Sequence, residues 1–338
     1  MYRARRRRLL LGVVVVLFLA YTAGQLLNDT GHVRMPTART RTDHRHTSMS
    51  AVTWPLQGQG ALVLGNGRPA ASPDQQPVPI ASVAKVMTAY LVLKRYPLSG
   101  AQDGFTFTLT DAEVEDETQD ASENQSRVAV AAGEQLTERQ LLEALLIPSG
   151  NNIAWILAAQ VAGSDTGFVA EMNAEARALG MDHTTYTDPS GFDPGTVSTA
   201  ADQLRVLRQA MHFAVFRQIV SMPSVTLPVA GTVTNFNPLI TEGYAGKTGS
   251  DSAAGGCLAF FTDVTVGGRP ETAVGVVLGQ GQGGNTQAIL AAAGEAAHQL
   301  VDSVAPAAGG PTIASPRVGP SNQDGQSQLF PPGPPGSN

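Results

Sequence analysis

The chain has 338 residues and a formal net charge of −6, and this charge is distributed unevenly. Residues 1–48 hold nine arginines and two acidic residues, a net of +7, whereas the remainder holds thirteen basic and twenty-six acidic residues, a net of −13. The basic cluster confined to the first eight residues is not a nucleic-acid footprint, which would need a patch on the folded domain, and the single cysteine, Cys257, excludes an intramolecular disulfide and a cysteine-based metal cluster.

The N-terminal segment predicts export of the rest of the chain. Nineteen residues without charge, Leu9 to Leu27, follow five arginines within the first eight residues. At about 1.5 Å per residue this stretch approaches the roughly 30 Å hydrocarbon core of a bilayer, and the preceding arginines place the N-terminus in the cytoplasm. We expect an uncleaved single-pass anchor in the cell membrane with the domain outside. The alternative is a cleaved signal peptide, which would leave the domain secreted.

Composition divides the chain into five segments. Residues 28–52 are polar and rich in Thr, Arg and His, and the last thirty-four residues contain eight prolines and six glycines, so neither segment can bury a core. The predicted segments are a cytoplasmic basic segment, the transmembrane anchor or signal peptide, a flexible stalk, one folded domain and a disordered tail, at residues 1–8, 9–27, 28–52, 53–304 and 305–338.

The predicted elements of the folded domain come in a simple order. Gly60 to Leu64 predicts a strand that enters a hairpin turn at Gly65-Asn66-Gly67. A block of helices follows, including one with helical apolar spacing after Ser82 and one that starts with a capping box at Thr137, then several strands with a turn at Gly267-Gly268, then a last helix. This order predicts an α+β domain with an antiparallel sheet flanked by helices. The predicted helices run from Ser82 to just before Pro97 and over 137–148, 152–161, 168–179, 199–216 and 286–304, and the later strands over 224–229, 243–247, 256–262 and 272–278.

An acidic run lies early in the helical block. Residues Asp111 to Glu123 carry seven carboxylates and no basic residue. The glycine and the spacing of a calcium loop are missing, so we predict a solvated surface loop there.

Lysine is rare in this chain, and its positions are informative. Only three lysines occur among the 22 basic residues, and two of them lie in short motifs with serine, threonine or glycine. Ser82 and Lys85 form a Ser-x-x-Lys pair at the start of a predicted helix, on the same helical face. A buried lysine can become a neutral base, which arginine cannot, so the pair predicts a nucleophile with its own base. A capped helix with an exposed lysine is the alternative.

Two other motifs complete a set. Ser149-Gly150-Asn151 follows a helix that ends at a proline, where it could reach a cleft or simply cap the next helix. Lys247-Thr248-Gly249 ends a predicted strand, where the glycine admits a close approach of a substrate backbone and the lysine and hydroxyl suit a carboxylate, unless it is only a strand end.

The order Ser-x-x-Lys, Ser-x-Asn, Lys-Thr-Gly resembles the signature of penicillin-recognising serine acyl transferases. The flanking text is similar to the D-alanyl-D-alanine carboxypeptidases, the low-molecular-mass penicillin-binding proteins, over about residues 55–303. This resemblance implies a β-lactamase/transpeptidase-like fold with a helical subdomain. The matching stretches are Ile80 to Tyr90, Leu146 to Asn152, Met172 to Ala174, Leu179 to Met181, Asp188 to Gly191 and Gly246 to Ser250.

The resemblance also implies a reaction, which is hydrolysis of the terminal D-Ala-D-Ala bond of a peptidoglycan stem peptide, without a metal or an organic cofactor. Ser82 would be the nucleophile and Lys85 its base. Ser149 would relay a proton, and Asn151 would hold Lys85 and the substrate amide. β-Lactam antibiotics would acylate the same serine. The implied substrate-binding residues are Lys247 and Thr248 for the terminal carboxylate, Gly249, and Ser250, whose backbone N–H would form the oxyanion hole with that of Ser82.

Some alternatives stay open on the sequence alone. A β-lactamase or a DD-endopeptidase would share the fold and the motifs, and a non-catalytic penicillin-binding or wall-binding sensor module could retain them. Gly150 stands where β-lactamases of class A carry an aspartate, which favours the carboxypeptidases. Relatives often carry an arginine beyond the strand that follows Lys-Thr-Gly, and residues 279–284 contain none.

Overall fold

The computed structural model describes residues 52–122 and 125–305. The predicted anchor, and nearly all of the predicted stalk and tail, lie outside these residues. Within the two described ranges no single helix is long and apolar enough to cross a bilayer, and one pair of helices, bent by 83° at its break, reaches that length and composition only together.

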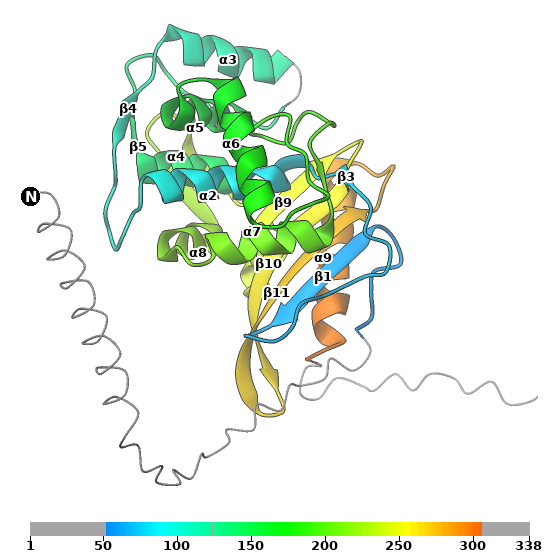
Figure 1. Cartoon of the computed structure of the whole chain (residues 1–338). Helices are drawn as coiled ribbons and strands as arrows, with labels where there is room; N and C mark the ends of the chain where they lie inside the picture. Colours follow the sequence, from blue (N-terminus) through cyan, green and yellow to red (C-terminus); the bar gives the residue numbers. More distant parts are fainter. Residues whose placement is uncertain (1–51, 123–124, 306–338) are drawn as a thin grey trace, which may run out of the picture. The chain divides into compact units, whose positions relative to one another are not determined.

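A five-stranded antiparallel sheet forms the centre of the domain (Figure 1). Its order is β2-β1-β11-β10-β9, so the first strand of the chain lies between its own short hairpin partner and the last strand. The predicted hairpin is confirmed, since Ala61 pairs with Ala71 and Leu62 with Ala70. The strands are β1 (Gln59–Leu64), β2 (Ala70–Ala71), β9 (Ala245–Asp251), β10 (Gly255–Val266) and β11 (Arg269–Gln280).

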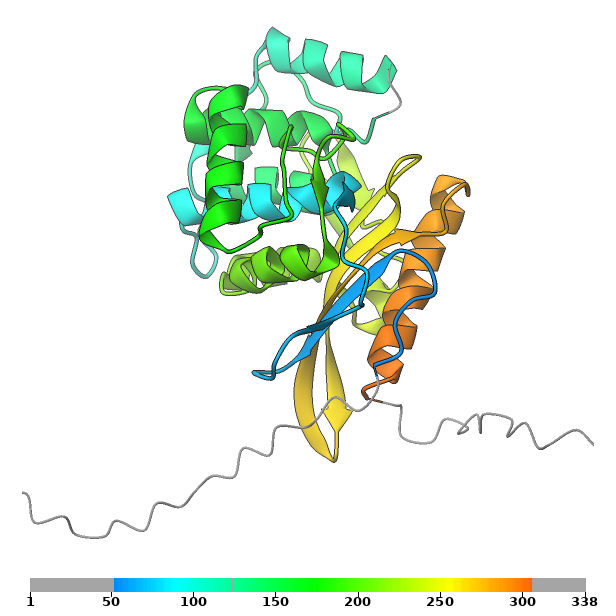
Figure 2. The ribbon, with the colours of Figure 1, turned by 45° about the vertical axis from the view of Figure 1, so that its right-hand side comes forward.

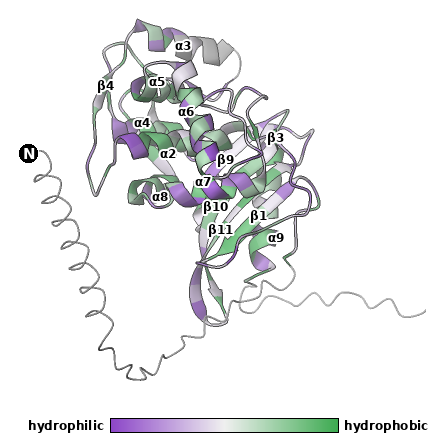
Figure 3. Ribbon diagram, viewed as in Figure 1, coloured by the Kyte–Doolittle hydropathy of each residue, from purple (hydrophilic) through white to green (hydrophobic). Residues whose placement is uncertain are grey.

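Both faces of this sheet are covered, which explains the continuous apolar runs in its strands. In β1, Ala61 and Val63 belong to a core shared with the helical block, while Leu62 between them belongs to a second core under the last helix. Figure 2 shows that last helix on one side of the sheet and the helical block on the other. Figure 3 shows hydrophobic residues along the central strands and hydrophilic ones toward the far end of the β10–β11 hairpin, where the strands become exposed.

The helices confirm the predicted order of a helical block, a group of strands and a closing helix. The predicted capping box is present, because Thr137 accepts a hydrogen bond from Gln140 N and the Gln140 side chain accepts one from Thr137 N. The helices are η1 (Ala81–Ala84), α2 (Lys85–Arg95), α3 (Asp111–Ser122), α4 (Glu138–Leu146), α5 (Asn151–Ala162), α6 (Asp165–Ala178), α7 (Ala200–Ala210), α8 (Ala214–Val220), η2 (Ile240–Glu242) and α9 (Thr286–Asp302).

Among the described residues, three two-stranded pairs lie outside the main sheet. Their strands have two to four residues, too few for a recognisable alternation of polar and apolar residues, so the sequence predicted only one of the six, at Ser224. The pairs are β3 (Val78–Pro79) with β6 (Val197–Ser198), β4 (Thr106–Thr108) with β5 (Gln135–Thr137), and β7 (Ser224–Leu227) with β8 (Gly231–Thr234).

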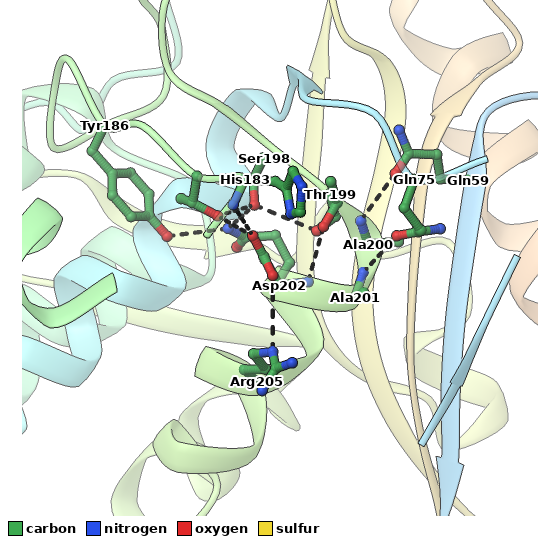
Figure 4. A network of polar contacts seen from close by, with 12 residues as sticks. Gln59, Gln75, His183, Tyr186, Ser198, Thr199, Ala200, Ala201, Asp202 and Arg205 are labelled. Carbon is green, nitrogen blue, oxygen red and sulfur yellow. Dashed lines mark hydrogen bonds and ion pairs between the residues drawn. The ribbon is translucent and has the colours of Figure 1, made fainter. Parts of the chain in front are cut away.

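Helix α7 is joined to the sheet through its N-terminus (Figure 4). Thr199 caps it by accepting from Asp202 N at 3.1 Å. The first two backbone N–H groups of the helix donate to glutamine side chains: Ala200 N donates to Gln59 of β1 at 3.2 Å, and Ala201 N to Gln75 of the loop after β2 at 2.9 Å. These bonds satisfy N–H groups that a helix start otherwise leaves unpaired, and they hold the helical block against the sheet.

Two predictions about the helical block were wrong. The acidic run is not a loop but helix α3, whose start is fixed by Thr110 and Glu113; Thr110 N donates to the Glu113 carboxylate at 2.7 Å. This Thr-x-x-Glu pattern is a helix-start signal, and the carboxylates in the first turn stabilise the helix through their interaction with the positive end of its dipole. The helix predicted over 199–216 is two helices, because the chain turns after Ala210 and places Phe213 edge-on against Tyr90, with ring centroids 6.1 Å apart.

Candidate active site

The three motifs meet where the helical block borders edge strand β9. Ser82 lies in the single turn η1, and Lys85 is the first residue of α2. Asn151 begins α5, and Lys247 lies in β9. Hydrogen bonds between side chains join residues separated by 66 and 98 positions in the sequence. The predicted grouping of these residues in one place is therefore confirmed.

Lys85 is the centre of the first half of the site. Its side chain is fully buried, with 0% of its surface exposed. Its Nζ donates to Ser82 Oγ at 2.7 Å, to Asn151 Oδ1 at 2.6 Å and to the carbonyl of Ser190 at 3.0 Å. The alternative of an exposed lysine on a capped helix is therefore wrong. The residue before the serine, Ala81, has a φ of +45°, a strained value for a residue other than glycine.

Ser149 and Asn151 do not serve as helix caps. The N-cap of α5 is Gly150, and no side chain caps the helix. Ser149 is buried and has a φ of +66°, in the left-handed region that favours glycine. Asn151 uses both ends of its amide, because Oδ1 accepts from Lys85 and Nδ2 donates to Gln125 Oε1 at 2.6 Å. The backbone strain of Ser149, and the burial and bonding of both residues, are features expected of site residues rather than of helix caps.

Lys247 forms the second half of the site. It is 1% exposed, and its Nζ donates to Ser149 Oγ at 2.9 Å and to the carbonyl of Thr248 at 2.8 Å. Burial, followed by the charge of nearby Lys85, lowers the pKa of the Lys247 amino group well below its ordinary value of 10.5. The site therefore disfavours carrying two positive charges at once.

Gly249 is required for a reason that differs from the predicted one. The sequence placed Lys247-Thr248-Gly249 at a strand end, with the glycine open to a substrate. The motif instead lies inside β9, and a Cβ on Gly249 would lie 2.8 Å from the carbonyl oxygen of Ile80 and 3.0 Å from Val83 N. Glycine thus allows the turn that carries Ser82 to pack directly on the strand.

A cleft of about 110 Å³ opens onto these residues. Thr248 and Ser250 from β9 line it together with both motif serines, and the two buried lysines lie outside its lining. The sequence did not predict four of its residues, at positions 126, 236, 286 and 290. It also gave no role to Ser190 and Gln125, which bind Lys85 and Asn151. The lining residues are Ser82, Ser126, Ser149, Phe236, Thr248, Gly249, Ser250, Thr286 and Leu290.

Other reactive groups in the described residues lie elsewhere or are unsuited to chemistry. No cluster of three or more His, Cys, Asp or Glu side chains within residues 52–122 and 125–305 could hold a metal ion. Cys257 is fully buried, and burial raises the pKa of its thiol to about 12, so the reactive thiolate is disfavoured.

Comparison with known proteins identifies relatives of this chain. The sequence model of the D-alanyl-D-alanine carboxypeptidase family matches residues 69–280. The chain is 35% identical over 201 residues to D-alanyl-D-alanine carboxypeptidase DacB2 of Mycobacterium tuberculosis, covering 56% of this chain and 65% of that protein. It is 34% identical over 197 residues to a D-alanyl-D-alanine endopeptidase of Pseudomonas aeruginosa, covering 55% and 60%. The chain thus spans somewhat less than two thirds of the length of these two relatives.

A solved structure supports the same relationship. The DD-transpeptidase of Streptomyces K15 superposes with a TM-score of 0.62 and 25% identity, covering 75% of this chain and 98% of the other. The predicted transpeptidase-like fold is therefore confirmed.

Proposed function

Because this chain belongs to the D-alanyl-D-alanine carboxypeptidase family, we propose that it is a serine DD-peptidase that removes the terminal D-alanine from peptidoglycan stem peptides. The hydrogen bond of 2.7 Å between Lys85 Nζ and Ser82 Oγ, inside a fully buried pocket for the amine, carries this proposal. It is the arrangement that a nucleophile with its own base requires.

In the proposed acylation, Ser82 Oγ attacks the carbonyl carbon of the D-Ala-D-Ala bond and its proton passes to Lys85. The developing oxyanion is stabilised by the backbone N–H groups of Ser82 and Ser250. The carbon–nitrogen bond then breaks, and the proton held on Lys85 is relayed through Ser149 to the departing amine, so that both side chains regain their starting protonation. Water attacks the resulting ester, the stem peptide leaves with a new carboxyl terminus, and the Ser82 hydroxyl is restored.

Substrate binding is proposed to involve β9 and the serines around the cleft. Lys247 and Thr248 would hold the terminal carboxylate, and Gly249 and Ser250 would line the approach of the peptide backbone. Lys247 lies behind the lining residues, so Thr248 and Ser250 would make the outer contacts. With no arginine in residues 279–284, these contacts replace the anchor that relatives often have.

Endopeptidase action on cross-linked stem peptides is a second candidate. The observation that favours it is that the relatives include proteins named D-alanyl-D-alanine endopeptidases, at 34% and 31% identity. The same acyl-enzyme on Ser82 would serve both reactions, and the two differ only in the group that leaves.

We further propose that the domain works outside the cell membrane. Peptidoglycan, the proposed substrate, lies there, and the uncharged segment Leu9 to Leu27 behind its arginines is suited to a membrane anchor with the N-terminus in the cytoplasm. Fractionation of cells that express the chain tests this: it should stay with the membranes after a high-salt wash, and recovery in the cytosol would contradict it.

The experiment that tests the activity uses the full chain with a fluorescent penicillin and with a peptide that ends in D-Ala-D-Ala. We expect a stable label on Ser82 and release of D-alanine, and neither with Ser82→Ala. Rapid turnover of the penicillin without release of D-alanine would identify a β-lactamase instead. A chain that takes no label and releases no D-alanine would be a wall-binding or sensor module.

A further inference from the structure

A loop that no proposed step uses lies directly behind Lys85. Asp188 at its start is 4% exposed, and four donors from the loop bind its carboxylate. Oδ2 accepts from Ser190 N at 3.2 Å, from Ser190 Oγ at 2.5 Å and from Phe192 N at 3.0 Å. Oδ1 accepts from Thr196 Oγ1 at 2.5 Å. All the hydrogen bonds to this buried carboxylate thus come from its own loop, and they hold the loop in its conformation.

The same loop is attached to the segment that carries the nucleophile and its base. Thr88 Oγ1 donates to the carbonyl of Pro189 at 2.6 Å, and the Thr196 carbonyl accepts from Ile80 N at 3.3 Å. Between these two contacts, Gly191 packs so closely on Ala81 that a Cβ on Gly191 would lie 1.9 Å from the Ala81 oxygen. The loop therefore forms a wall against the η1 turn and the start of α2.

This wall presents one group to the amine. The N–H groups of Ser190 and Phe192 both point at Asp188 Oδ2, and Gly191 between them has a φ of +80°. Two N–H groups that converge on one anion form a nest. The Ser190 carbonyl lies between these two N–H groups and accepts from Lys85 Nζ at 3.0 Å. Asp188 thus fixes the direction of this carbonyl without touching Lys85.

We propose that Asp188 is a positioning residue for Lys85 and acts through the Ser190 carbonyl. The Ser190 carbonyl and Asn151 Oδ1 are two acceptors that keep Nζ within 2.7 Å of Ser82 Oγ. If the loop relaxes, the amine loses one of these acceptors and its alignment with the hydroxyl. Asp188 is absent from the residues that line the cleft, so its loss should slow the acylation step and leave ligand binding unchanged. This role rests on the function proposed above.

The test is stopped-flow acylation of the full chain by a fluorescent penicillin, which separates the maximal acylation rate from the half-saturating concentration. Asp188→Asn keeps the shape of the side chain but puts an N–H₂ group where N–H and O–H groups already point. We expect its maximal rate to fall by about 10- to 100-fold, as misplaced catalytic groups do, while the half-saturating concentration stays within about twofold.

Thr196→Val is the matched control. It removes the donor on the Oδ1 side of the same carboxylate and leaves the nest that holds the Ser190 carbonyl, so we expect a lower melting temperature with a maximal rate within about twofold of wild type. Ser190→Ala removes a donor from Oδ2 but keeps the carbonyl, and an intermediate loss of rate is expected; it serves if Asp188→Asn fails to fold.

Two results would overturn this role. One is wild-type acylation by Asp188→Asn, or by Ser190→Ala if the first variant does not fold. The other is a loss of rate in Thr196→Val as large as in the Oδ2-side variants, which would show a merely structural effect. A wild-type chain that takes no label would remove the proposed function itself and this role with it, and that outcome is distinct because the unmodified chain fails.

Discussion

The two buried lysines of the site differ in what holds them. Lys85 and Lys247 are both almost fully buried, and each donates to a serine hydroxyl, at 2.7 Å and 2.9 Å. Lys85 binds Ser82, three residues before it, and Asn151 and Ser190 from two distant segments. Lys247 binds Ser149 and the backbone of its own strand. The first amine is thus positioned by the tertiary fold, and the second mainly by β9.

Lys94, the remaining lysine of the chain, lies at the surface. Its exposed amine pairs with Glu175 at 2.6 Å. An arginine could replace it there. Lys85 is proposed to act as a neutral base, which arginine cannot become, and burial lowers the pKa of Lys247, which arginine would not allow either. Lys85 and Lys247 therefore differ in their proposed roles. Lys85 is the base for Ser82, whereas Lys247 binds the substrate carboxylate and contacts Ser149, which relays the proton.

The largest effect is expected at the proposed base. Lys85→Arg keeps a positive charge in the pocket and cannot accept a proton, so penicillin labelling of Ser82 should fall by about 1,000-fold or more. Lys94→Arg makes the same chemical change on the surface and should label like wild type. Stopped-flow labelling of both variants measures the difference. Comparable rates for the two would contradict the assignment of the base.

A smaller loss of activity is expected at the second lysine. Lys247→Met should reduce labelling by about 10- to 100-fold, because Ser149 loses its donor and the ligand carboxylate its partner.

The pH dependence of the free energy of unfolding should also differ between Lys247→Met and wild type. Since folding lowers the pKa of Lys247, the folded wild type binds fewer protons than the unfolded chain between that lowered pKa and 10.5, and its free energy of unfolding should rise with pH over this window. Lys247→Met lacks this group and should show a flatter profile, with a stability near pH 7 equal to or above that of wild type. Thermal melts from pH 6 to pH 10 measure this, and a wild-type profile no steeper than that of the variant would contradict it.

The contact between β9 and the turn that carries Ser82 can be tested at Gly249. Gly249→Ala places a methyl group against the backbone of the nucleophile turn, so we expect the free energy of unfolding to drop by about 1–3 kcal/mol and labelling to fall by about tenfold. Denaturant titration and labelling of the same preparation measure both. Gly100→Ala controls for backbone strain without a clash, since a Cβ there meets no atom within 4 Å but Gly100 has a φ of +56°; it should lower stability and leave labelling unchanged. Wild-type labelling by Gly249→Ala would show that the close packing is not needed.

The smallest effect on activity is expected at Glu138, a buried carboxylate away from the cleft. It is 1% exposed, and its Oε1 makes no hydrogen bond. Burial raises its pKa to about 7 from 4.5, so the folded chain binds a proton more tightly and loses stability as pH rises from 4.5 to about 7. Glu138→Gln should therefore be more stable than wild type by about 1–3 kcal/mol at pH 8 and similar at pH 4, with unchanged labelling. A variant less stable at pH 8 would contradict this.

The sequence predicted the parts of the fold that have long periodic patterns. The apolar spacing after Ser82 and the capping box at Thr137 identified helices, and the alternation of turn and apolar residues identified β1, β10 and β11. It could not locate the true extent of β9, because buried Lys247 and Thr248 look like a strand end until their partners are known. The helix at Asp111 was missed although its Thr-x-x-Glu start was present.

The site was predicted through side chains that carry chemistry, and its supports were missed. Ser82, Lys85, Ser149, Asn151 and Lys247 belong to short motifs that can be recognised locally. Ser190 contributes a backbone carbonyl from 105 positions away, and any residue type offers that group, so the matching stretch Asp188 to Gly191 did not reveal this contact with Lys85. Gln125 reaches Asn151 from a segment without a motif, and only the tertiary structure brings the two amides together.

The central claim is that a buried amine activates Ser82. Its most direct test is peptide mapping by mass spectrometry after the full chain and its Lys85→Arg variant are treated with penicillin. The account predicts a single penicilloyl adduct on the peptide that contains Ser82 in the wild type and none in the variant. An adduct on another residue, or equal modification of Ser82 in both proteins, would contradict it.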